Sequence, residues 1–108
     1  LGGIAQGVGQ ALYEHGVYDE DGQLVTGSML DYTMPRADNF PMIESDRIET
    51  PSPSNTLGVK GVGEMGSITS PPAVVNAVVD ALSDYGVKHI DMPLTSEKIW
   101  NLIQTNGG

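Results

Sequence analysis

The sequence places one carboxylate, Glu64, in a loop that carries four glycines between residues 58 and 66. Glycine lets a backbone approach a ligand closely and adopt conformations that other residues avoid. A carboxylate held in such a loop can act as a general base, with a proton affinity set by what it faces. The alternative interpretation is a tight connection before a helix, in which Glu64 is only a solvated charge.

Residues 61–66 also match the pattern G-x-G-x-x-G. A dinucleotide site needs a strand before this pattern and a helix that opens at its third glycine. The sequence predicts a helix only from Pro71, and Glu64 would direct a negative charge at a pyrophosphate. A generic nucleotide-binding fold is therefore a weaker alternative. The absence of a Gly-Lys-Ser/Thr run after the glycines excludes a P-loop.

Other site chemistries find little support in the residue types. The chain has no cysteine, which excludes disulfides, thiolate ligands and a cysteine nucleophile. His15 and His89 are single and far apart, so they do not form a metal-ligand pattern and structural or surface roles are expected. No Gly-x-Ser-x-Gly motif indicates a serine hydrolase. Glu64 therefore remains as the candidate catalytic residue.

Length and charge limit the class of protein. The chain has 108 residues, enough for one domain or part of one. Its formal net charge of −9 argues against nucleic acid and anionic membranes as partners. No apolar run has transmembrane length and no signal peptide is evident, so a cytoplasmic location is expected. Because Leu1 leads directly into an amphipathic pattern, we expect a segment of a longer protein.

Three amphipathic stretches predict helices that would position Glu64. Apolar residues at i, i+4 and i+8 predict a helix over residues 4–12, in which Gly7 and Gly9 indicate close approach by another backbone or a ligand. Ser70, followed by two prolines, is expected to cap a second helix that ends at Gly86. Thr95 or Ser96 is expected to cap a third helix, which carries Trp100 in the core or at an interface.

Strands are predicted between these helices. The turn at 19–22 predicts a short hairpin over residues 17–25, and residues 28–40 should be extended. Side chains alternate over residues 42–49, which predicts a strand, and residues 87–92 predict another. Three helices with short mixed strands give an α+β fold class.

Five motifs in order carry a resemblance to a known family. They are Gly3-Ile4-Ala5-Gln6-Gly7-Val8-Gly9-Gln10-Ala11-Leu12, Asp31-Tyr32-Thr33-Met34-Pro35, Gly58-Val59-Lys60-Gly61-Val62-Gly63-Glu64, Pro71-Pro72-Ala73-Val74-Val75-Asn76-Ala77-Val78 and His89-Ile90-Asp91-Met92-Pro93-Leu94-Thr95. Residues 1–108 closely resemble the C-terminal end of the molybdopterin-binding large subunit of the molybdenum hydroxylases, the xanthine dehydrogenase and aldehyde oxidase family. Within that family they look most like the large chain of aerobic carbon monoxide dehydrogenase.

The resemblance implies specific roles. Glu64 corresponds to the catalytic base, which deprotonates a molybdenum-bound hydroxyl that attacks the substrate carbon. Further residues would line the pterin cofactor: Gln6, Gly7, Lys60, Gly61, Val62 and Gly63. In this family the pterin supplies the sulfur ligands of molybdenum, so no protein metal ligand is expected and the lack of cysteine is no objection.

The resemblance also implies cofactors and partners. They are a molybdenum–molybdopterin in its cytosine dinucleotide form, iron–sulfur clusters and FAD on partner subunits, the remainder of the large subunit, and a small substrate such as carbon monoxide, an aldehyde or an N-heterocycle. The 108 residues alone are expected to be inactive. The alternative from another class is a non-catalytic subunit-docking or degenerate module of such an enzyme.

Overall fold

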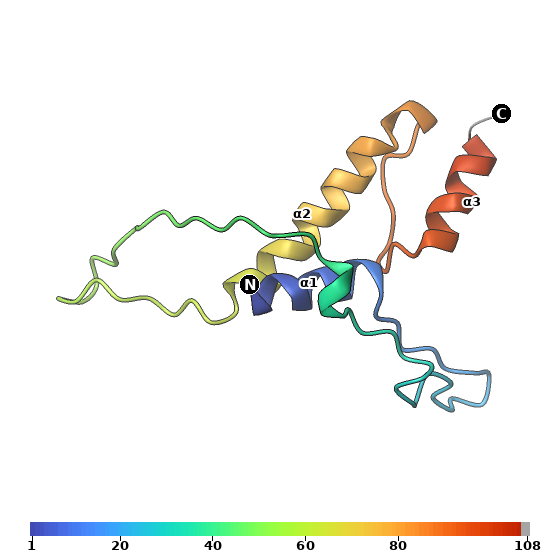
Figure 1. Cartoon of the computed structure of the whole chain (residues 1–108), viewed down its shortest axis with the longest axis horizontal. Coiled ribbons are helices and arrows are strands. Elements are labelled where there is room, and N and C mark those ends of the chain that lie inside the picture. The colour runs from blue at the N-terminus through green and yellow to red at the C-terminus, as the bar shows by residue number, and fades with distance from the viewer. Residues whose placement is uncertain (107–108) are drawn as a thin grey trace.

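The computed structural model describes residues 1–106, which form three α-helices joined by long irregular segments (Figure 1). The helices are α1 (Gly2–Leu12), α2 (Met65–Ala81) and α3 (Ser96–Asn106), with 3₁₀ turns η1 (Ala37–Asn39) and η2 (Ser83–Tyr85). The three predicted helices are therefore present. Two long excursions, residues 14–36 and 40–64, leave the helical body, and the described chain extends over 56 × 38 × 27 Å.

α1 and α2 cross through small residues. Gly3 and Gly7 lie one turn apart on α1 and meet Gly66 and Ser70, which lie one turn apart on α2. A Cβ on Gly3 would stand 3.1 Å from the Gly66 Cα, and one on Gly7 would stand 2.6 Å from the Ser70 Cβ. The predicted close approach at Gly7 is confirmed, and another helix makes it. Because Gly3 meets Gly66 and Gly7 meets Ser70, both helices begin at the same end of the contact (Figure 1).

α2 begins at Met65, five residues before the predicted cap at Ser70, so that prediction was wrong. Pro71 and Pro72 lie inside the helix, where each removes a backbone hydrogen bond. Contact with α1 favours this geometry, because the Pro71 ring packs where Gly7 has no side chain. Three hydroxyls donate hydrogen bonds to carbonyl oxygens of the first turn: Ser67 to Glu64 at 2.9 Å, Thr69 to Met65 at 2.8 Å, and Ser70 to Gly66.

A small core lies where the end of α2, the connection 86–95 and α3 meet. Its buried centre consists of Leu82, Val87, Ile90 and Leu94. Half-buried side chains from all three helices pack against it: Leu12, Val75, Val78, Val79, Tyr85, Ile99, Leu102 and Ile103. The Leu94 amide also donates a 2.7 Å hydrogen bond to the Ala11 carbonyl, which joins the core to the end of α1.

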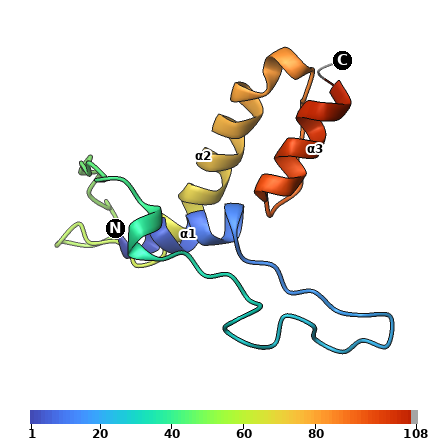
Figure 2. The same ribbon diagram turned by 45° about the vertical axis from the view of Figure 1, so that its right-hand side comes forward.

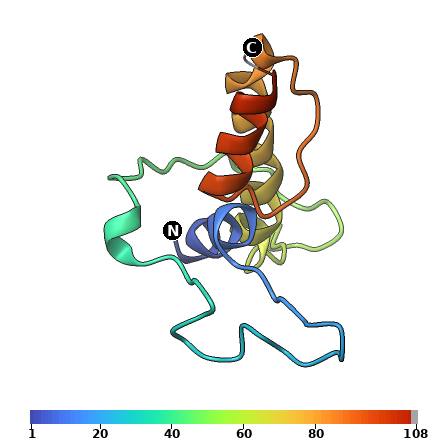
Figure 3. The same cartoon turned by 90° about the vertical axis from the view of Figure 1, so that its right-hand side faces the viewer.

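Figures 2 and 3 show α3 beside α2, with the connection 86–95 returning along them so that both helices run the same way. Thr95 caps α3 as predicted, because its hydroxyl accepts the Lys98 amide at 3.3 Å. Trp100 is 60% exposed, so it lies outside the core. Of the two roles expected for this side chain, only the interface remains.

The predicted mixed strands are absent from the described residues. The short hairpin predicted over residues 17–25 does form, with one antiparallel bridge between Tyr18 and Leu24. The Val25 amide donates to the Val17 carbonyl at 2.8 Å, and the Asp19 amide donates to the Gln23 carbonyl at 3.0 Å. Residues 42–49 and 87–92 have no strand partner within residues 1–106, so both strand predictions were wrong for this chain. A strand needs a neighbour for its backbone hydrogen bonds, and a period-two pattern does not say where that neighbour lies. The α+β class is thus corrected to helices with irregular segments.

Candidate functional site

Glu64 stands at the point where the glycine loop becomes α2. It is the N-cap residue, and its backbone carbonyl accepts the Ile68 amide at 3.0 Å. Its side chain is exposed and makes no capping hydrogen bond. The positive end of a helix favours a negative charge at this position. The backbone of Glu64 is therefore held by the helix start, while its carboxylate oxygens remain open to a ligand.

Gly61 and Gly63 precede Glu64, and nothing within the described chain requires them to be glycine. A Cβ built on either would find no heavy atom within 4 Å. Neither has a positive φ, in contrast to Gly58 at 67°. The other glycine of the loop, Gly66, is explained by its contact with α1. The absence of side chains at 61 and 63 thus leaves bare backbone exposed beside Glu64.

The motif on α1 lies next to this loop. Gly3 and Gly7, which flank Gln6 on the helix, contact the first turns of α2, and the Gln6 side chain is exposed. Gln6 therefore belongs to the helix whose glycines contact the start of α2, and its contact with a cofactor stays a prediction. Gly7 is buried in the α1–α2 contact, which gives it a packing role within the chain. Its predicted contact with a cofactor stays a prediction.

The remaining predicted residues of the loop, Lys60 and Val62, are also exposed. The Lys60 ammonium donates a 3.1 Å hydrogen bond to the Thr50 hydroxyl, which joins the two sides of the excursion 40–64. The Val62 carbonyl accepts the Met65 amide at 3.3 Å in the turn that leads into α2. Gln6 and residues 60–64 thus lie on the exposed surface of α1 and of the loop that leads into α2.

The histidines take no part in this surface. His89 is exposed and its Nε2 lies 2.8 Å from the Asp91 carboxylate, and His15 is exposed in the excursion 14–36. Within residues 1–106, no group of three histidine or carboxylate side chains could hold a metal ion. No helix of the described chain has the length and apolarity needed to cross a bilayer.

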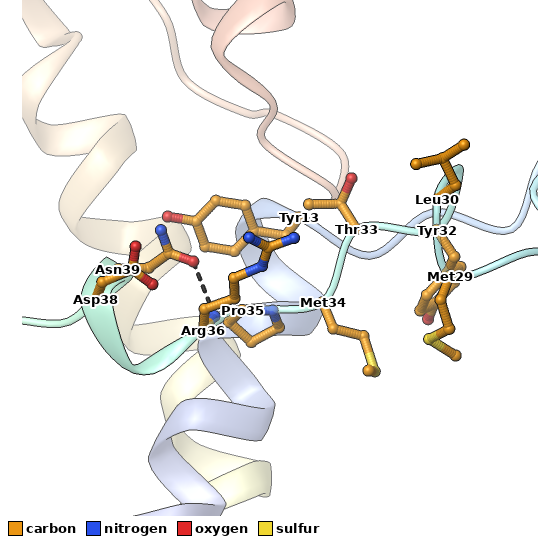
Figure 4. A pocket seen from close by; sticks show the side chains of 10 residues that line it. All are labelled: Tyr13, Met29, Leu30, Tyr32, Thr33, Met34, Pro35, Arg36, Asp38 and Asn39. Carbon is orange, nitrogen blue, oxygen red and sulfur yellow. Dashed lines mark hydrogen bonds between the residues drawn. The ribbon is translucent and has the colours of Figure 1, made fainter.

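A cavity of about 480 Å³ lies elsewhere, between the end of α1 and the segment that leads to η1 (Figure 4). None of the predicted site residues lines it. Its lining residues are Tyr13, Met29, Leu30, Tyr32, Thr33, Met34, Pro35, Arg36, Asp38 and Asn39. Four of them belong to the motif Asp31–Pro35, to which the sequence assigned no role. That motif was the signal from which this cavity could have been found.

Two contacts hold the segment 32–35 against α1. The Tyr32 hydroxyl donates a 3.0 Å hydrogen bond to the Glu14 carboxylate. The Pro35 ring packs against Gly9, where an added Cβ would stand only 2.9 Å from the ring carbons. The hydrogen bond to Glu14, with smaller contributions from burial and from the Glu14 charge, raises the pKa of Tyr32. Gly9 therefore serves packing of this segment, and side chains approach it closely instead of the backbone or ligand that was predicted.

Comparison with known proteins places this geometry in context. Residues 1–41 match the family model described as a molybdopterin cofactor-binding domain. The chain is 49% identical over 98 residues to the nicotine 6-hydroxylase large subunit of Paenarthrobacter nicotinovorans, which covers 91% of this chain and 12% of that protein. The chain thus spans about an eighth of the length of the curated relatives it matches.

Solved structures extend the likeness to the whole fold. Quinoline 2-oxidoreductase from Pseudomonas putida 86 matches 97% of this chain and 13% of its own, with a TM-score of 0.90 and 46% identity. The Cu,Mo-CO dehydrogenase matches 98% of this chain and 13% of its own, with a TM-score of 0.92 and 34% identity. Because each match covers nearly the whole chain, it includes the excursions 14–36 and 40–64 as well as the helices.

Proposed function

Because the chain belongs to the molybdopterin-binding large subunits of the molybdenum hydroxylases, we propose that it forms one wall of a molybdenum cofactor site in which Glu64 acts as the base. One observation carries the proposal. Gly61 and Gly63 present bare backbone beside an exposed carboxylate, and no contact within the described chain explains either glycine. Close approach by a group from outside these residues explains both.

The residues present fit a pterin cofactor. Backbone groups of the loop 60–63 and the amide of Gln6 can donate and accept hydrogen bonds, as a polar heterocycle requires. When bound, the molybdenum cofactor would supply the two-electron oxidation and oxygen-transfer chemistry. The cytosine dinucleotide form is part of the proposal and rests on the resemblance.

Glu64 is proposed to accept a proton from the hydroxyl that attacks the substrate. A base must lie within hydrogen-bond reach of the proton it takes, and a fixed loop with a free carboxylate meets that condition once a partner wall closes the site. The start of α2 holds the backbone from which this carboxylate projects, because the Glu64 carbonyl accepts the Ile68 amide in the first helical turn.

An N-heterocycle is the substrate class that the relatives favour. Nicotine 6-hydroxylase at 49% identity and quinoline 2-oxidoreductase at 46% are named for compounds that contain a pyridine ring. The carbon monoxide dehydrogenase large chain of Hydrogenophaga pseudoflava is 38% identical. We therefore propose hydroxylation of a small N-heterocycle, with aldehydes and carbon monoxide as less favoured substrates.

The proposed enzyme needs parts that these residues do not provide. We propose that the remainder of a large subunit supplies the other walls, that iron–sulfur and FAD subunits carry the electrons away, and that the assembly is cytoplasmic. The net charge of −9 makes nucleic acid an unsuitable partner. The alternative proposal is a docking module without catalysis.

Cofactor loading of the assembled enzyme tests the proposal. Gly63→Val adds a side chain where the described chain leaves open space, so folding should persist while molybdenum and pterin content fall. Gly16→Val is the matched control, because Gly16 is an exposed loop glycine whose added Cβ would find only Tyr18 at 4.0 Å. Wild-type content in Gly63→Val would contradict a cofactor wall at this loop. A cofactor-free wild-type assembly would favour the docking module.

A further inference from the structure

An extended segment, residues 42–50, enters the excursion 40–64. Among the described residues, no backbone–backbone hydrogen bond joins positions 42–50 to any other position. The contacts there involve side chains: the Arg47 amide donates to the Asp46 carboxylate at 2.7 Å, an exposed ion pair joins Arg47 to Glu49 at 3.7 Å, and the Thr50 hydroxyl accepts the Lys60 ammonium at 3.1 Å. Figure 1 shows the segment as a long stretched trace that passes away from the helices. Backbone amides and carbonyls in folded proteins are nearly always paired, so these groups call for a partner or for water.

The side chains of this segment alternate between two faces, and each face carries an isoleucine. Ile43, Ser45 and Arg47 fall on one face, and Glu44, Asp46 and Ile48 fall on the other. Ile48 is 92% exposed, and Met42 at the start of the segment is 97% exposed. The extended backbone and the exposed apolar side chains are both explained if a neighbouring strand lies outside the described residues.

The shape of the chain also indicates a missing neighbour. Its radius of gyration is 17.7 Å, whereas a compact domain of this length has a value of about 13 Å. The Cu,Mo-CO dehydrogenase matches 98% of this chain at a TM-score of 0.92, although the matching part is only 13% of that solved chain. The extended geometry is therefore one that a much longer folded chain also adopts.

We propose that residues 42–49 add as a β-strand to an open sheet edge formed by the remainder of a molybdopterin-binding large subunit. The inference rests on the proposed function, because the family supplies the partner. Strand addition satisfies the free amides and carbonyls of the segment through main-chain hydrogen bonds, while alternate side chains set the register. It also covers the apolar side chains that protrude from the segment, and it fixes the stretch of chain that leads to the Glu64 loop.

Hydrogen exchange in the assembled molybdenum enzyme, read by mass spectrometry on peptides over residues 42–50, tests this proposal. We expect these amides to exchange at least about 10²-fold more slowly than in an unpaired chain. Successive N–H groups of a strand point to opposite sides, so Ser45→Pro and Asp46→Pro each remove one possible ladder bond. At least one of the two should abolish the protection, while Ser45→Ala and Asp46→Ala should retain it.

Two outcomes would overturn the inference: rapid exchange of the segment in the assembled enzyme, or full protection in both proline variants. Equal protection in a dimer of the isolated chain would assign the edge to a second copy and would also overturn it. Molybdenum content measured on the same samples separates the two proposals. Protection of the segment in an assembly that contains no molybdenum would contradict the proposed function but support the proposed strand.

Discussion

The substitution Gly66→Ala should destabilise the crossing of α1 and α2, although alanine is the better helix former. A Cβ on Gly66 would stand 2.9 Å from the carbonyl carbon of Gly3 and 2.9 Å from the Ile4 nitrogen. Carbon atoms pack best at about 3.5–4.0 Å, so the two helices would have to separate by roughly 0.6–1 Å. Because the obstructing atoms are backbone, no side-chain rotation relieves the contact.

The expected magnitude follows from two opposing terms. Overpacking of a tight contact costs about 1–3 kcal/mol, and replacing glycine by alanine inside a helix returns about 0.5–1 kcal/mol. The net loss therefore lies between about 0 and 2.5 kcal/mol. Its central value of about 1.2 kcal/mol would lower a urea midpoint by about 0.6–1.2 M for a slope of about 1–2 kcal/mol/M.

Urea unfolding of the 108-residue chain, followed by helical circular dichroism, measures this effect. Gly2→Ala is the matched control, because Gly2 lies in the first turn of α1 and a Cβ there would find nothing within 4 Å. That variant should match the wild type or gain up to about 1 kcal/mol. The reasoning is refuted if Gly66→Ala is as stable as Gly2→Ala, since α1 and α2 would then not be in backbone contact.

Two further predictions concern pH and the isolated chain. The pKa of Tyr32 is raised above its ordinary value of 10.0, chiefly by the hydrogen bond to Glu14. The stability that this bond contributes is therefore present below pH 10 and is lost as pH rises through the raised pKa. Tyr32→Phe should make the fall of the urea midpoint above pH 10 shallower than in the wild type. Tyr18→Phe is the control, because this side chain is 64% exposed, and it should leave that fall unchanged. If the urea midpoint fell equally steeply with pH in both variants, the hydrogen bond assigned to Tyr32 would be contradicted. The isolated chain should show no hydroxylase turnover and no stoichiometric molybdenum, because the Glu64 loop is open to solvent and forms one wall only. Metal analysis checks this, and stoichiometric molybdenum bound to the isolated chain would contradict it.

The helices could be predicted from the sequence because each carries its own signals. The apolar spacing over residues 4–12 and the cap at Thr95 act within a few residues, and both are found in the structure. The start of α2 could not be found in this way. The two prolines favour a first turn at position 71, but packing of Pro71 against Gly7 extends the helix back to Met65. Tertiary contact outweighed a local preference.

The strand predictions failed for a different reason. The alternation over residues 42–49 is real in the sequence, but the described chain contains no edge that could pair with it. The candidate site was predictable in part. The glycine pattern singled out the loop, but only the structure separates Gly66, which packs on α1, from Gly61 and Gly63, which face open space. The cavity beside Tyr32 went unassigned because its lining residues are brought together by folding of a segment without periodic signals.

The base role of Glu64 is tested most directly by single-turnover reduction of the assembled enzyme with an N-heterocycle such as quinoline, normalised to bound molybdenum. Glu64→Gln keeps the size of the side chain but removes the basic oxygen, and Glu97→Gln is the control at another exposed carboxylate in the first turn of a helix. We expect Glu64→Gln to lower the reduction rate by at least about 10²-fold at unchanged molybdenum content, while Glu97→Gln retains the wild-type rate. If Glu64→Gln were reduced at the wild-type rate, Glu64 would not be the base and the loop would be only a structural connection before α2.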